Sequence, residues 1–239
     1  MNALNIRSAW VLGLTLALGL SVLGYQLAGA AIKVKQYERS VTVKGLAERD
    51  VMADIVLWPI DFAAAGNQLE ELYERMDSYA GKIKAFLIKN GVAPEDITVA
   101  SPSITDKLAQ QWGGAEKAEF RYTATQTITL YSENVEAVRA VMGQLSELGK
   151  QGIVFTSDNY QSETEYIYTG LNQIKPEMIE EATRNAREVG EKFAKDSESK
   201  LGKIKKASQG QFSVRARDRS NPHIKKVRVV STVEYYLSD

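Results

Sequence analysis

The stretch FRYTATQTITLYS, residues 120–132, alternates apolar and polar side chains along its length. The apolar positions are Phe120, Tyr122, Ala124, Ile128 and Leu130, and the positions between them are Arg121, Thr123, Thr125, Thr127 and Thr129. Only Gln126 interrupts the apolar side. A period of two predicts a β-strand with one buried and one solvated face. Because antiparallel sheets are the ones covered on a single side, we expect such a sheet here.

Helices are predicted over three segments that have apolar residues at three- and four-residue spacing. They are residues 69–90, 135–148 and 177–201, each followed by a glycine. Asn67 is suited to cap the first helix, and Glu70 completes a capping box. Asn134 is suited to cap the second helix, and Pro176 lies at the start of the third.

The remaining apolar segments predict strands, with Pro59 favouring an edge or a bulge. One half of the chain has a strand, a helix and two strands at residues 51–61, 69–90, 96–104 and 120–131, after a first strand at 40–50. The other half has the same order at residues 153–168, 177–201, 203–217 and 225–237, and helix 135–148 connects the two. We therefore predict an α+β fold: a mostly antiparallel sheet with helices on one face and an internal βαββ pseudo-repeat.

The composition excludes several classes of function. The 239-residue chain has no cysteine, so it has no disulfide framework, no thiolate nucleophile and no zinc site built on sulfur. Its formal net charge is zero, which argues against a general binder of nucleic acid.

The N-terminal segment SAWVLGLTLALGLSVLGYQLAGAAI, residues 8–32, contains no charged side chain. A bilayer-spanning helix needs roughly 20 such residues, whereas a secretory leader has an apolar run of about 7–15. We therefore predict a transmembrane signal anchor over residues 1–33 and an extracytoplasmic domain over residues 34–239. Cleavage after Ala30 is the alternative, because Ala28 and Ala30 are small; the product would be a soluble periplasmic protein.

Residues 37–62, YERSVTVKGLAERDVMADIVLWPIDF, resemble the opening of the SIMPL-domain family of bacterial envelope proteins. The resemblance rests on Val41, Val43 and Gly45 of a V-x-V-x-G strand and on the Ala53-Asp54 step. It continues in the alanine-rich helix and following strand of residues 171–212. It implies a periplasmic α+β domain, ring-like or cage-like oligomers in some relatives, and a poorly defined function with no agreed catalytic residues.

Basic residues concentrate near the C-terminus, between residues 203 and 228. We predict that Arg215, Arg217 and Arg219 project from one strand face. The candidate residues for an anionic partner are Lys205, Arg215, Arg217, Arg219, Lys226 and Arg228. Anionic lipid or an acidic protein surface would suit them. The alternative is that basic side chains on an edge strand discourage aggregation.

Other motifs have weaker claims to chemistry. Ser197 to Lys200 matches S-x-x-K and Ser157 to Asn159 matches S-D-N, which together suggest a serine acyl hydrolase, but their order is reversed and no K-T-G follows. The single histidine, His223, is predicted to be a surface turn residue. Glutamates 177, 180, 181, 188 and 191 are interpreted as an ion-paired helix face. The stripe Ala182, Ala186, Gly190 and Ala194 predicts close packing, on its own sheet or on another subunit.

These observations predict a membrane-tethered envelope protein in the inner membrane, with one N-terminal span and its domain in the periplasm. It would act as a homo-oligomer or through a binding partner, without catalysis and without a cofactor. A binder of anionic lipid or polyanion is the second hypothesis, and the acyl hydrolase is the third.

Overall fold

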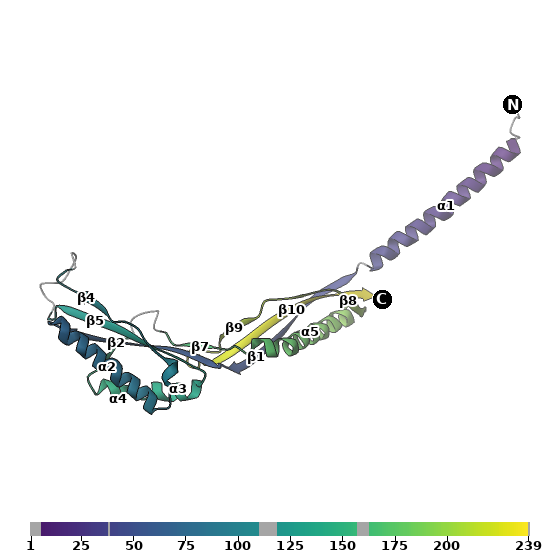
Figure 1. Cartoon of the computed structure of the whole chain (residues 1–239). Helices are drawn as coiled ribbons and strands as arrows, with labels where there is room; N and C mark the ends of the chain where they lie inside the picture. The colour runs from purple at the N-terminus through teal and green to yellow at the C-terminus, as the bar shows by residue number, and fades with distance from the viewer. Residues whose placement is uncertain (1–5, 38, 110–118, 157–162, 239) are drawn as a thin grey trace. The chain divides into compact units, whose positions relative to one another are not determined.

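The computed structural model describes residues 6–37, 39–109, 119–156 and 163–238 (Figure 1). Its helices are α1 (Ile6–Tyr37), α2 (Leu69–Lys89), α3 (Val135–Met142), α4 (Ser146–Gly149) and α5 (Leu171–Asp196), with a 3-10 turn η1 (Pro94–Asp96). Its strands are β1 (Ser40–Met52), β2 (Ile55–Gly66), β3 (Ile97–Val99), β4 (Ser103–Asp106), β5 (Tyr122–Ser132), β6 (Val154–Phe155), β7 (Glu165–Ile167), β8 (Lys200–Gln209), β9 (Ser213–Ala216) and β10 (Ile224–Ser238).

The chain forms two compact units. Unit 1 comprises Met1–Glu48, Lys175–Ser213 and Arg228–Asp239, and unit 2 comprises Arg49–Ile174 and Val214–Val227. Strands β1 and β10 contribute residues to both units. The predicted α+β class with antiparallel sheets and an apolar N-terminal helix is confirmed, although the strands form two sheets where one was predicted.

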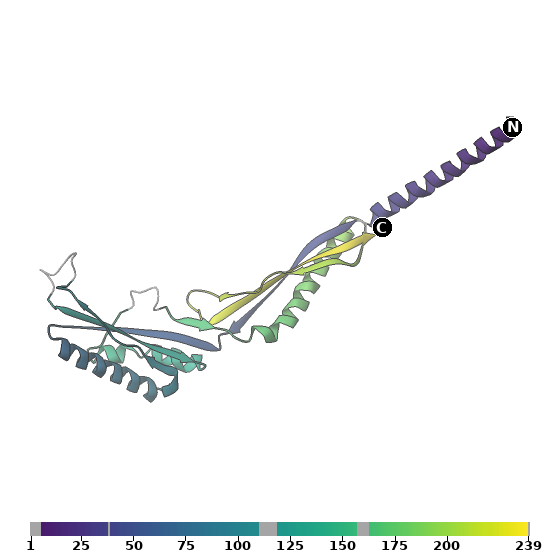
Figure 2. The same cartoon turned by 45° about the horizontal axis from the view of Figure 1, so that its top comes forward.

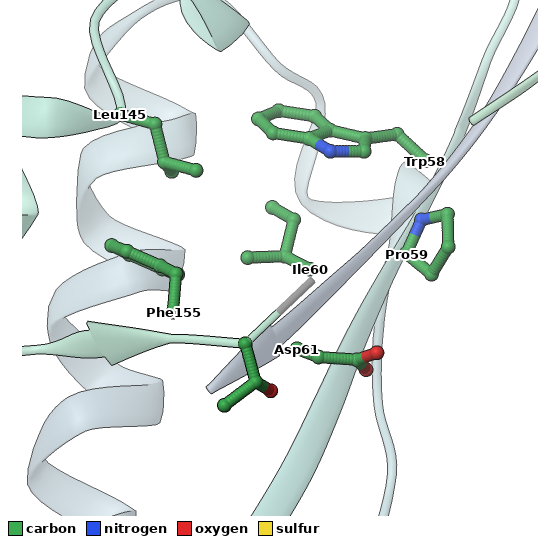
Figure 3. Close-up of a pocket in the computed structure, with 7 residues that line it drawn as sticks. Trp58, Pro59, Ile60, Asp61, Leu145 and Phe155 are labelled. Atoms are coloured by element: carbon green, nitrogen blue, oxygen red, sulfur yellow. The ribbon is translucent and has the colours of Figure 1, made fainter. Parts of the chain in front are cut away.

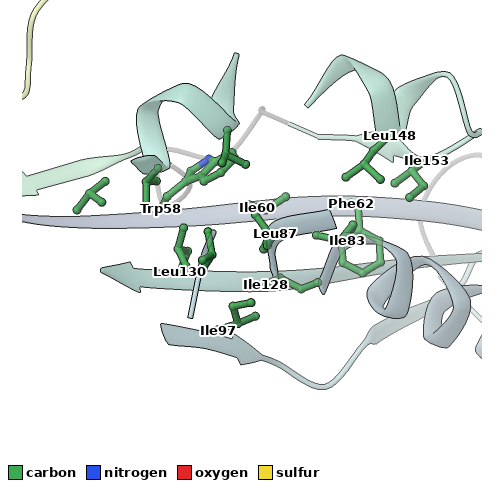
Figure 4. Close-up of a cluster of buried hydrophobic side chains, with 14 of the residues drawn as sticks. Trp58, Ile60, Phe62, Ile83, Leu87, Ile97, Ile128, Leu130, Leu148 and Ile153 are labelled. Atoms are coloured by element: carbon green, nitrogen blue, oxygen red, sulfur yellow. The ribbon is translucent and has the colours of Figure 1, made fainter. Parts of the chain in front are cut away.

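Unit 2 is built on the strand predicted from FRYTATQTITLYS. Strand β5 pairs antiparallel with β2 along its whole length, with Ile128 opposite Ile60 and Leu130 opposite Trp58. The sheet order is β3-β5-β2-β6, with β4 on β5 and β7 on β2. Helices α2 and α4 pack apolar side chains into one core with this sheet, and Figure 4 shows Ile83, Leu87 and Leu148 of this core around β2.

Gln126 interrupts the apolar side of β5 for a structural reason. Its side chain is buried, and its Nε2 donates to the main-chain carbonyl of Ala100 at 2.7 Å. The bond ties the segment between β3 and β4 to the central strand. A buried amide is tolerated where it satisfies a main-chain acceptor in this way.

Unit 1 contains β8 and most of β1 and β10, in the order β1-β10-β8; β9, which also pairs with β10, lies in unit 2 apart from Ser213. Helix α5 covers one face of this sheet (Figure 2). The closest approach is at Gly45: a Cβ placed there would lie 1.8 Å from the carbonyl oxygen of Ala182 and 2.4 Å from the amide nitrogen of Ala186. The stripe of small residues on α5 therefore packs on its own sheet.

The predicted βαββ pseudo-repeat is not confirmed. Residues 153–168 were expected as one long strand that opens the second half. In the described part of this range, 153–156 and 163–168, the strands are β6 and β7, and both pair with β2 in unit 2. The order of connections is nevertheless shared between the sheets. In chain order, β2, α2, β3 and β5 of one sheet correspond to β1, α5, β8 and β10 of the other, with further elements between them. In each sheet the last of these strands lies between the other two.

Several predicted boundaries shift. Helix 135–148 is divided into α3 and α4 around Gly143, while Asn134 does cap α3 by accepting from the amide of Ala137. Asn67 does not cap α2. Its side chain accepts from the amide of Arg121 instead, and Gln68 occupies the cap position without a side-chain bond.

Helix α5 begins at Leu171 and ends at Asp196, earlier than predicted at both ends. Pro176 lies inside it, and Gly202 lies in β8. The predicted strand 203–217 is interrupted between β8 and β9.

The N-terminal helix α1 has a segment long and apolar enough to cross a membrane, Ala9–Ala30, and none of it is buried. The helix does not end at Ala30 but continues to Tyr37. The predicted apolar N-terminal helix is therefore confirmed, and its length and composition suit a membrane anchor or a signal sequence.

Replacing Gly45 with alanine should destabilise unit 1, because the new methyl group overlaps main-chain atoms of α5. We expect a loss of about 3 kcal/mol or more in the free energy of unfolding, at the upper end of overpacking costs. Gly149→Ala is the matched control, since a Cβ there meets nothing within 4 Å. Urea unfolding of both variants checks this; equal midpoints would contradict the close approach.

Candidate functional site

The six basic candidate residues are divided between the two units. Lys205 and Arg228 belong to unit 1, whereas Arg215, Arg217, Arg219 and Lys226 belong to unit 2.

In unit 1, both basic residues are neutralised by carboxylates on neighbouring strands. Lys205 Nζ lies 3.0 Å from Glu234 Oε1, and Arg228 Nη1 lies 3.4 Å from Glu48 Oε1. Glu234 also accepts from the Ser40 hydroxyl at 2.6 Å. The bond from Ser40, followed by that from Lys205, lowers the pKa of Glu234. These charges connect β1, β10 and β8 within the sheet.

In unit 2, Arg217 is also paired. Its Nε lies 2.9 Å from Asp218 Oδ2, and this hydrogen bond is the main cause of the lowered pKa of Asp218. Asp218 Oδ1 in turn accepts from the amides of Ser220 and Asn221. Its carboxylate thus shapes the turn between β9 and β10.

The prediction that three arginines share one strand face is wrong. Strand β9 ends at Ala216, so only Arg215 lies in it, and Arg219 lies in the turn. Arg217 donates its amide to the carbonyl of Ile224 at 2.8 Å, just beyond the end of β9. Arg215 is exposed and Lys226 on β10 is half-buried.

A hollow of about 150 Å³ lies beside β2 in unit 2 (Figure 3). Trp58, Ile60, Leu145 and Phe155 give it apolar walls. The carboxylate of Asp61, in the same wall, accepts from the Thr127 hydroxyl on the neighbouring strand. An apolar space of this size suits a single benzene-sized group.

The hollow was not predicted from the sequence, although Pro59 in its lining marks the place. The carbonyl of Asp61 accepts from the amide of Thr156 on the β6 side at 2.9 Å. Because alternate residues direct their main-chain groups to the same side, Pro59 faces this side too, between the residues paired with β6 and with β7. Strand β2 is central in the sheet, so the predicted edge position of Pro59 is wrong. Proline is tolerated here because it has no N–H that would be left without an acceptor in the gap between β6 and β7.

Ala53 and Asp54 bind to two distant segments, and Asp54 holds the residues that lead into helix α5. Asp54 accepts from the amide of Thr169 through both carboxylate oxygens at 2.9 Å and from its hydroxyl at 2.7 Å. Ala53 donates its amide to the carbonyl of His223 at 2.8 Å. Both residues thus hold together segments that are distant in sequence.

A family model, SIMPL, described as "Protein of unknown function (DUF541)", matches residues 41–235. The chain belongs to the SIMPL family. The match starts at Val41, ends at Tyr235 and covers both units but not α1. No curated protein matches the chain.

His223 lies in a turn, as predicted, but it is buried, so the prediction that it is a surface residue is wrong. Its side chain is only 6% exposed, and its ring meets that of Tyr166 edge-on at 6.0 Å. Burial is the main cause that lowers the pKa of His223, and the positive charges of Arg139 and Arg217 add to it.

Among the described residues, the serine motif has a structural role. Ser197 donates its hydroxyl to the carbonyls of Phe193 and Ala194, at 2.9 and 3.1 Å, at the end of α5. The S-D-N residues 157–159 lie outside the described residues. On the glutamate-rich face, Glu191 pairs with Arg187 at 3.1 Å, and no cluster of three metal-binding side chains occurs in the described ranges.

The SIMPL domain should lose stability as the pH falls below 6.5, the ordinary pKa of histidine. The folded-state pKa of His223 is lowered, so the unfolded chain takes up the proton first and protonation favours unfolding. His223→Gln should flatten this pH dependence. Urea unfolding of both proteins at pH 7.5 and 5.0 checks this. If the variant loses as much stability between the two pH values as the wild type does, groups other than His223 cause the loss.

Proposed function

We propose that this SIMPL protein is a membrane-tethered protein of the bacterial cell envelope. In this proposal α1 spans the inner membrane once, and the SIMPL domain lies in the periplasm. The domain acts by assembling with copies of itself or by binding a partner, without catalysis.

The exposed apolar helix α1 carries the proposal. All side chains described in its span Ala9–Ala30 are exposed, which is costly in water and favourable in a bilayer. The helix also continues seven residues beyond Ala30, as far as Tyr37. The exposure fits an anchor and a leader alike, whereas a helix that runs on past the cleavage site supports the retained anchor.

The contacts of the domain support a binding role over chemistry. The polar residues that the sequence motifs suggested for catalysis or binding are largely engaged in structural bonds. Ser197 bonds to helix carbonyls, and three of the basic candidates, Lys205, Arg217 and Arg228, pair with carboxylates. We therefore rank the serine acyl hydrolase last.

Full-length protein in bacterial membranes should remain in the membrane after a high-pH carbonate wash and should retain its N-terminus. The matched variant Ala28→Leu/Ala30→Leu removes the small residues of the cleavage site and should behave identically. N-terminal sequencing and protease accessibility in spheroplasts provide the measurements. A soluble product that begins at Ala31 in the wild type, but not in the variant, would overturn the anchor.

A second candidate function is the binding of anionic lipid by unit 2. Arg215 and Lys226, on the paired strands β9 and β10, favour it because neither has a carboxylate paired to it among the described residues. Arg215→Ser/Lys226→Ser should abolish salt-sensitive binding to anionic vesicles. Arg217→Ser/Arg228→Ser, which removes charges already paired with carboxylates, should weaken it little. Equal sedimentation with zwitterionic and anionic vesicles would exclude this candidate.

A further inference from the structure

The solvent-exposed side of α2 has a row of residues with a large side chain at each end, a charged residue inside each of these, and a glycine in the middle. Tyr73, Asp77, Gly81, Lys84 and Ile88 follow one another at spacings of four, four, three and four residues, so they lie along one side of the helix. All five are exposed, Tyr73 to 45% and Ile88 to 40%. We call this set the α2 stripe.

No packing contact within the subunit requires a glycine at position 81. Glycine destabilises the interior of a helix relative to alanine. At Gly45 the close approach of α5 explains the glycine, but a Cβ at Gly81 would meet nothing within 4 Å. An exposed glycine in the middle of a helix allows another main chain to come close from outside.

The charges of the stripe also lack partners within the helix. Asp77 and Lys84 have no oppositely charged residue three or four positions away. Neither forms an ion pair within the part of the chain that the structure describes. The helix dipole explains Glu70, Glu71 and Lys89 in the end turns, but its effect is lost within the first and last turn. Asp77 and Lys84 lie beyond its reach.

We propose that the α2 stripe pairs with the α2 stripe of a second copy of this chain, antiparallel, across a two-fold axis beside Gly81. The pairs 73/88 and 77/84 have the same midpoint, between Ala80 and Gly81. A two-fold axis at that point places Asp77 against Lys84 of the second copy, and Tyr73 against Ile88. An isologous interface requires this kind of self-complementarity.

The inference rests on the proposed assembly of the SIMPL domain and specifies one of its contacts. The occupant is a second copy because each end of the stripe complements the other in charge and in apolar character. Gly81 at the axis allows the two helices to cross closely.

Charge exchange between full-length chains tests the pairing. Asp77→Lys and Lys84→Asp should each weaken self-association on the order of tenfold or more, measured by co-purification of two differently tagged copies in detergent. Mixing these two variants should restore association, because both contacts of the mixed pair are again between opposite charges. The double variant Asp77→Lys/Lys84→Asp should restore it too. Glu71→Lys and Lys82→Asp are controls: they reverse exposed charges outside the stripe and should have little effect.

Cross-linking in the native membrane provides the second readout. Because the chain has no cysteine, Gly81→Cys introduces the only thiol. Oxidation should give a disulfide-linked dimer for Gly81→Cys and little for the exposed control Lys150→Cys. If the wild type assembles but charge exchange does not restore association, the α2 pairing is wrong and the proposed assembly stands. A wild type that is monomeric throughout would overturn both.

Discussion

The fold of unit 1 depends on the contact between Gly45 and helix α5. At this position the helix main chain lies so close to β1 that a single methyl group would overlap it. The contact requires small residues on both sides, which explains the buried row of Ala182, Ala186 and Ala194 on α5.

The residues of the family motif therefore make structural contacts. Gly45 admits the helix, and Asp54 holds the segment that precedes it through Thr169. Ala53 joins the same place to His223. A motif made of such residues identifies a fold without identifying a reaction, so a shared motif in this family is compatible with different binding partners.

Sequence reasoning predicted what depends on neighbouring residues. The alternation of residues 120–132 predicted β5 and its covered face, and the spacing and final glycine predicted α2. It could not predict which strands pair, because periodicity is local: β1 and β2 are adjacent in sequence but belong mainly to different sheets. The burial of His223 depends on Tyr166, and the neutralisation of Lys205 depends on Glu234. These partners lie far apart in sequence and no local pattern shows them.

In the function proposed above, α1 tethers the domain to a bilayer and the surfaces of the domain bind other proteins. The exposed span of α1 supports attachment to a bilayer, and the faces of the domain are free to meet other proteins. The central claim is that the domain acts by association. Light scattering of the full-length chain in detergent, corrected for the micelle, tests it most directly. The account predicts multiples of the 26.5 kDa protomer mass, whereas a single protomer mass at every concentration would contradict self-assembly.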